Sequence, residues 1–199
     1  MKLFVLLFLF ANLFAQNDYS LRIAYGEPTK SDFLEILTGN IKSHPYNVSV
    51  TALDAGYLLA EDAFDLPIDF YIKAGLSKFD ENGLQKDVYE GTLYIKAYYN
   101  IDFLDNRVRV GFGEGASYTD GVIAVEQLEA TSKQDNNSKY LNYIDFSLDF
   151  DIGRLVGYQP LYNTSLGWVV KHRSGIFGLI NNVRHGGSNY NAVYLETKF

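Results

Sequence analysis

A histidine and a serine stand two positions apart near the end of the chain, in the segment WVVKHRSG, at His172 and Ser174. In a β-strand, residues two apart point to the same face with Cα atoms about 6.6 Å apart, so an imidazole can reach a hydroxyl oxygen. A His that removes the proton of a Ser makes that Ser competent to attack an ester. The pair is therefore a candidate hydrolytic site, provided that a strand carries it.

Alternation with a period of two residues recurs along the chain, whereas no helical period persists beyond the first 16 residues. In segment 143–152, every second residue from Ile144 is apolar, and the residues between them include Asp145 and Asp151. The apolar phase of another segment changes near Asp54, which predicts a β-bulge there. In all, eight predicted strands can be counted, at 19–25, 47–59, 66–77, 88–101, 107–118, 139–152, 165–174 and 189–199.

Two architectures fit eight such strands: a soluble sandwich or lipocalin-like barrel with its apolar faces inside, and a transmembrane barrel with those faces toward lipid. The connections at 60–65 and 104–107 are short, and 153–164 is longer than usual for an inner turn. Long polar connections alternate with these, near 26–46, 78–87, 119–138 and 175–188. Short inner turns and long outer loops are typical of outer-membrane barrels. The sequence therefore predicts an all-β fold, an eight-stranded antiparallel transmembrane outer-membrane β-barrel with a polar filled interior.

Charged residues of both signs fall on the predicted inward faces of the strands. Because buried charges are tolerated only when they are paired, we interpret them as a structural network and not as a channel or a proton path. They are Arg22, Asp69, Lys73, Glu90, Lys96, Arg107, Arg109, Asp145, Asp149, Asp151, Lys171, Arg173, Glu196 and Lys198.

Both ends of the chain carry predicted signals. The start, MKLFVLLFLFANLFAQ, has a basic residue, a short apolar run and Ala15 before Gln16. This is typical of a signal peptide, here residues 1–15, and the run is too short for a membrane anchor. Residues 16–199 are then one barrel domain. The final Phe199 is similar to the C-terminal signature of outer-membrane barrels, which predicts that the bacterial barrel-assembly machinery is a partner and the outer membrane the location.

The amino-acid composition excludes several kinds of functional site and argues against one kind of partner. Cysteine is absent, which excludes disulfides, thiolate metal sites and a Cys nucleophile. The net charge of −7 argues against a nucleic-acid partner. We expect no cofactor and no metal.

Strand parity then places the candidate pair. His172 and Ser174 share a face with Leu166, Trp168 and Val170, so they should lie on the lipid-facing side near the outer end of segment 165–174. One interpretation is the polar and aromatic girdle common at membrane interfaces. The other is a catalytic pair that meets the esters of outer-leaflet lipid.

An eight-stranded outer-membrane barrel with His-x-Ser late in the seventh strand, followed by a Gly-rich loop and the last strand, resembles the PagL-type lipid A 3-O-deacylases. The resemblance implies that His172 is the base and Ser174 the nucleophile. It implies hydrolysis of an acyl ester of lipid A, with lipopolysaccharide as the partner and no cofactor. It further implies that a Glu early in the last strand orients the His.

The chain departs from this family at two positions. Gly175 stands where the family has an Asn after the Ser, and Ser188 aligns with the family's Glu. Substitutes for the missing groups are Asn142 on the neighbouring strand, Glu114, His185 and Asn189.

Gly175 and Gly178 of the following loop could also let backbone N–H groups approach an oxyanion, although glycine is commonest in such loops as a turn residue. The alternative to an enzyme is a non-enzymatic small barrel, with a surface, adhesion or structural role, whose long loops at 26–46 and 119–138 would carry the function.

Overall fold

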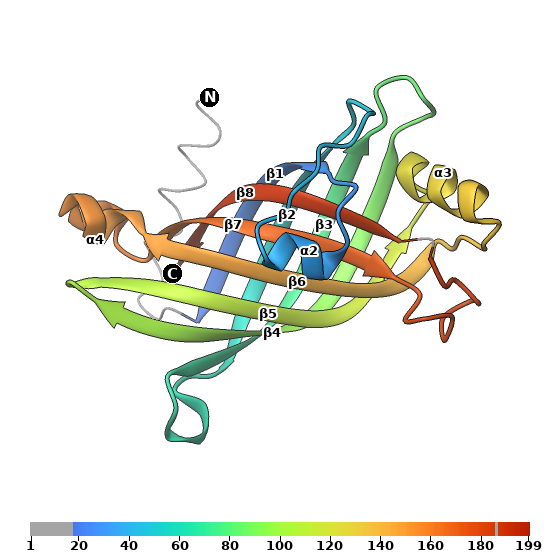
Figure 1. Cartoon of the computed structure of the whole chain (residues 1–199). Coiled ribbons are helices and arrows are strands. Elements are labelled where there is room, and N and C mark those ends of the chain that lie inside the picture. Colours follow the sequence, from blue (N-terminus) through green and yellow to red (C-terminus); the bar gives the residue numbers. More distant parts are fainter. Residues whose placement is uncertain (1–17, 186) are drawn as a thin grey trace.

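The chain forms a closed antiparallel barrel in which every strand pairs with its neighbours in sequence and β1 pairs with β8 (Figure 1). The computed structural model describes residues 18–185 and 187–199, so the predicted signal peptide at 1–15 lies outside the described residues. The strands are β1 Tyr19–Pro28, β2 Ser49–Ala60, β3 Ile68–Asp80, β4 Val88–Phe103, β5 Asn106–Thr119, β6 Tyr140–Asp151, β7 Thr164–Ser174 and β8 Ser188–Lys198. The predicted eight-stranded barrel is confirmed, with strand bounds within a few residues of those expected.

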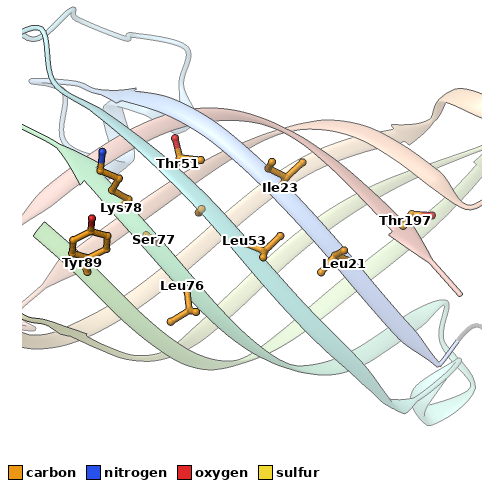
Figure 2. A pocket seen from close by; sticks show the side chains of 10 residues that line it. Leu21, Ile23, Thr51, Leu53, Leu76, Ser77, Lys78, Tyr89 and Thr197 are labelled. Atoms are coloured by element: carbon orange, nitrogen blue, oxygen red, sulfur yellow. The ribbon is translucent and has the colours of Figure 1, made fainter. Parts of the chain in front are cut away.

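The outer wall of the barrel is apolar, as the alternation requires. On β3, for example, Leu76 is 70% exposed while the neighbouring Ser77 is buried. Figure 2 shows Leu21, Ile23, Leu53 and Leu76 on β1–β3, where they line a shallow apolar groove on this wall. An apolar exterior around a closed barrel belongs in lipid, and this architecture is that of a bacterial outer-membrane protein.

The strands are strongly tilted. A row of directly paired residues that starts at Tyr19 passes through Tyr57, Glu114 and His172 and returns to β1 at Thr29, ten residues further along the same strand. Such a stagger fixes the tilt of the strands in a barrel of eight.

Exposed tyrosines mark the outer edge of the apolar wall: Tyr89, Tyr118 and Tyr140, here called the outer tyrosine belt. Tyrosine is enriched where a membrane meets water. Ile144, the strand partner of His172, lies four residues below Tyr140 on β6, which is about 13 Å along the strand. The row that carries His172 therefore crosses β6 within the lipid-facing band and not above it.

Paired charges fill the barrel interior. Arg22 is fully buried and donates to the carboxylates of Asp54 and Asp145 and to the hydroxyl of Tyr94. Lys96 also pairs with Asp145. A second group joins four strands: Arg109 bonds Asp149 at 2.8 Å and Glu196 at 3.2 Å, and Lys73 pairs with Glu196. These contacts support the interpretation of the inward charges as a structural network.

One detail of the sequence prediction was wrong. Asp54 causes no change of phase, because Ala52, Asp54 and Gly56 all point inward in one regular alternation. The register shift of β2 lies instead between Leu58 and Ala60. Arg107 has the inward parity of Arg109, as expected, but it lies at the inner mouth of the barrel, where it is partly exposed and pairs with Asp102 beside the β4–β5 turn.

The two ends of the barrel differ as expected. Short connections join β2 to β3 and β4 to β5, and helices α4 (Ile152–Val156), η1 (Ala63–Asp65) and η2 (Gln159–Leu161) lie at this inner end. The opposite end carries the long loops, with α2 (Phe33–Leu37) after β1 and α3 (Ala124–Lys133) after β5 (Figure 1). Among the described residues, no helix has the length and apolar content needed to cross a membrane.

An apolar cluster closes the interior at the outer end. Ile123 and Val125, at the start of α3, pack against inward residues of the strands beneath them. The strand residues of this cluster are Val50, Phe79, Val88 and Tyr190, and Val48 joins them from the loop before β2. The interior is therefore apolar at its outer mouth and charged below it.

Candidate active site on the outer barrel wall

Strand β7 places His172 and Ser174 on the outer wall, as parity predicted. Both side chains are partly exposed, while Lys171 and Arg173, which precede them in turn, are buried in the interior. The register sets their neighbours: Ser174 lies opposite Asn142 of β6, and His172 lies opposite Asn189 of β8. Two of the candidate supporting residues, Asn142 and Asn189, therefore flank the pair on the adjacent strands.

Asn189 holds the imidazole of His172. Its Oδ1 lies 2.7 Å from Nδ1 of His172, and its Nδ2 donates to the backbone oxygen of Ser31 at 3.0 Å. Because the amide nitrogen is committed to Ser31, Oδ1 is the atom that faces the ring, and Nδ1 must carry the proton. The other ring nitrogen, Nε2, is then free to accept a proton, which is the form that a general base needs.

Asn142 lies directly opposite Ser174 in the pairing of β6 with β7. Directly opposed residues of an antiparallel pair have Cβ atoms about 4.5–5.5 Å apart on one face. Asn142 is only 8% exposed although it lies on the outer wall. Its side chain therefore lies on the same face as Ser174 and is largely shielded from solvent.

The two candidate glycines shape the turn after β7. Gly175 accepts hydrogen bonds from the N–H groups of Gly178 and Ile180, and any Cβ at Gly175 would collide with the backbone oxygen of Val183. Gly178 has φ = +95°, a conformation that favours glycine. The N–H of Gly178 is thus already used within the turn.

The remaining candidates lie apart from the pair. Ser188, which the sequence aligned with the family's Glu, points into the barrel and donates to Glu126 at 2.7 Å. The outward residue at this height of β8 is its neighbour Asn189, so the expectation for Ser188 was off by one residue. Glu114 shares the paired row of His172 but is separated from it by β6, and His185 is exposed in the loop after β7.

No family model and no curated protein matches the sequence. Solved structures similar to this chain include the outer membrane enzyme PagL, with a TM-score of 0.62 and 11% identity over 90% of this chain and 99% of that one. Neisserial surface protein A is also similar, with a TM-score of 0.51 and 13% identity over 92% of this chain and 98% of that one. These similarities show a shared barrel fold.

Behind the outward pair, on the inner side of the same strands, a carboxylate joins β7 to β8. Glu126 of α3 is fully buried and accepts from Nε of Arg173 at 2.8 Å and from the hydroxyl of Ser188. Burial raises the pKa of Glu126, and the charge of Arg173 opposes this. Alternation could not have revealed Glu126, because it lies on a loop helix. The helix-forming run VEQLEA at 125–130 was the available signal.

Glu126→Ala should lower the free energy of unfolding by about 1.5–3 kcal/mol, since it removes hydrogen bonds to a charged group and leaves Arg173 less well paired. Urea denaturation in detergent micelles measures this. Glu129→Ala is the control, because Glu129 is on the same helix but pairs with Lys133 at the surface, where a salt bridge contributes little. Equal shifts for the two variants would contradict the assignment.

Finally, Phe33 of α2 lies over the imidazole. The two ring centroids are 5.3 Å apart with an interplanar angle of 41°. Within the described residues, no hydrogen bond joins His172 to Ser174, and no group of three His, Cys, Asp or Glu side chains could hold a metal ion. The site thus brings together a serine, a histidine and an amide hydrogen-bonded to that histidine, next to an aromatic ring.

Proposed function

We propose that this protein is an outer-membrane esterase that removes an acyl chain from lipid A or a related outer-leaflet lipid. The observation that carries the proposal is the hydrogen bond from His172 to Asn189, because it fixes the tautomer that a base beside Ser174 requires. An Asn can orient a catalytic His, as it does in the Cys-His-Asn proteases. Asn189 thus takes the place of the Glu that the PagL-type family uses.

The reaction follows from the positions of these side chains. The Oγ of Ser174 attacks the ester carbonyl carbon and its proton passes to Nε2 of His172. The amide of Asn142 stabilises the negative charge on the former carbonyl oxygen. Collapse of this intermediate expels the alcohol, which takes the proton from His172, and water then releases the fatty acid from Ser174.

The substrate class follows from the face that carries the site. His172 and Ser174 lie on the lipid-facing wall near its outer end, so the esters within reach are those of lipids in the outer leaflet. In a Gram-negative outer membrane that leaflet contains lipid A, whose acyl chains are ester-linked. The similarity in fold to the outer membrane enzyme PagL supports this choice.

The wild-type protein in detergent should release a hydroxy fatty acid from lipid A, and Ser174→Ala should release none above background. Mass spectrometry of the lipid and of the released acid measures both. Ser165→Ala is a matched control, because Ser165 is on the same strand but buried at its inner end. Unchanged lipid A with the wild-type protein would overturn the proposal.

A second candidate is a non-enzymatic surface barrel. It is favoured by the position of Phe33, whose ring covers His172. Among the described residues, His172 also makes no hydrogen bond to the hydroxyl of Ser174. In this case the long outer loops carry the function. Deletion of loop 120–139 would then abolish binding to cells or matrix, while Ser174→Ala would leave binding unchanged and lipid A would stay intact.

A further inference from the structure

The β1–β2 loop folds back onto the barrel wall over the candidate site. The N–H of Thr29 donates to the backbone oxygen of Asn189 at 2.9 Å, and the Asn189 amide donates to Ser31 at 3.0 Å. Two residues later, the ring of Phe33 packs on His172. These three contacts hold the start of α2 against the outward face of β7 and β8, and Figure 1 shows the helix in front of β7.

Helix α2 has an inner and an outer side. Ile36 is 2% exposed, whereas Leu34 is 74%, Leu37 41% and Ile41 50% exposed. A single exposed apolar side chain is ordinary, but here three lie within eight residues, on α2 and just after it, in a segment held against the barrel wall.

The rest of this segment is well ordered by polar contacts. Asp32 and Glu35 form a capping box at the start of α2, and Glu35 also pairs with Lys42 at 2.8 Å. The loop is therefore a folded element that keeps the side chains of Leu34, Leu37 and Ile41 exposed.

The position of α2 along the membrane normal indicates that lipid contacts its exposed apolar side chains. His172 belongs to a row that crosses β6 about 13 Å along the strand below Tyr140 of the outer tyrosine belt. This row rises toward the outer end of the barrel from β6 to β8, because it reaches β1 at Thr29. A helix that rests on His172 therefore lies at the outer edge of the lipid-facing wall, close to the level of the belt.

We propose that α2 is a cover of the candidate site that contacts lipid at the outer edge of the barrel wall. Acyl chains of the outer leaflet contact Leu34, Leu37 and Ile41, and Phe33 must leave the ring of His172 before an ester can reach it. The lipid contact stands on the position of α2 alone, whereas the gating step rests on the proposed esterase function. The two parts are therefore tested separately.

Fluorescence quenching tests the lipid contact without any assay of activity. Trp168→Phe removes the single Trp, and Leu34→Trp in that background puts a reporter on α2. After reconstitution into bilayers of phosphatidylcholine with brominated acyl chains, this α2 reporter should be quenched about as strongly as a reporter at Leu53→Trp on the barrel wall. A reporter at Leu84→Trp, in the β3–β4 loop, should be quenched weakly. Quenching of the α2 reporter no stronger than that of the loop reporter would overturn the lipid contact.

Hydrolysis of a water-soluble short-chain ester tests the gating. Phe33→Ala should raise kcat/KM for p-nitrophenyl butyrate by about threefold to tenfold, because loss of the ring contact increases the fraction of open sites. Leu34→Ala, which removes an outward side chain of the same helix, should change it less than about twofold. A Phe33→Ala value at or below the wild-type value would overturn the gating. If the wild-type protein hydrolyses no ester, the esterase proposal fails and the gating with it, while the quenching result stands by itself.

Discussion

Asn189→Ala should lower kcat for lipid deacylation by about 10²–10⁴-fold while the barrel stays folded. The amide oxygen of Asn189 is 2.7 Å from Nδ1 of His172, the ring nitrogen that faces away from the reaction. Without that acceptor the ring can rotate, and the proton can move to Nε2, the nitrogen that must accept the proton of Ser174. In serine proteases, a change that leaves the catalytic imidazole in the wrong tautomer has an effect at the upper end of this range. Initial rates on lipid A at saturating substrate measure the change.

Asn189 also anchors Ser31, so a second variant must separate its two roles. Asn189→Asp keeps an acceptor for His172 and loses the donor to Ser31. It should retain at least about a tenth of the wild-type kcat, because a tenfold loss corresponds to about the net free energy of one hydrogen bond. Asn191→Ala, on the same face two residues further along β8, should have little effect. An Asn189→Asp variant as slow as Asn189→Ala would show that the anchor, and not the imidazole contact, is what matters.

Arg22→Met should destabilise the folded barrel by about 3–5 kcal/mol, because it leaves buried carboxylates with less charge to pair with. Arg22 is fully buried between Asp54 and Asp145, and its Nη2 also donates to Tyr94 at 2.8 Å. In the variant, Lys96 remains as an ion-pair partner of Asp145. The midpoint of urea unfolding, followed by the mobility shift between folded and heated protein on a gel, measures the loss.

Arg107→Met is the matched control for Arg22→Met. Arg107 pairs with Asp102 beside the β4–β5 turn, where both side chains are partly exposed. Surface ion pairs of this kind contribute about 0–1 kcal/mol. If the two variants unfold at the same urea concentration, the interior network does not stabilise the barrel as described.

The barrel could be predicted from the sequence because lipid imposes a strict alternation on each strand. β6 shows this clearly, with Phe146 and Leu148 outward and Asp145 and Asp149 inward. The prediction failed where that rule has an exception. Val50 and Ala52 point inward because the outer mouth of the interior is apolar, and the sequence pattern around Asp54 therefore resembled a change of phase.

For the site, strand alternation could predict only which side of the barrel wall each residue faces. Parity placed His172, Ser174 and Asn142 on the outer wall, but the loop after β7 left the start of β8 uncertain by one residue. A one-residue slip moves a side chain to the other face, which is why Ser188 was expected where Asn189 lies. Phe33 and Glu126 come from loops without alternation, and only the folded chain brings them to the two sides of β7.

The interior ion pairs also constrain how the barrel can assemble. Arg22 meets Asp145 across 123 positions of sequence, and Lys73 meets Glu196 across the same separation. A half-built sheet would expose these charges singly to lipid, where an unpaired charge is very unfavourable. Intermediates with only some of the strands inserted should be scarce, and insertion and closure should occur as one slow cooperative step, as expected for a topology dominated by distant contacts.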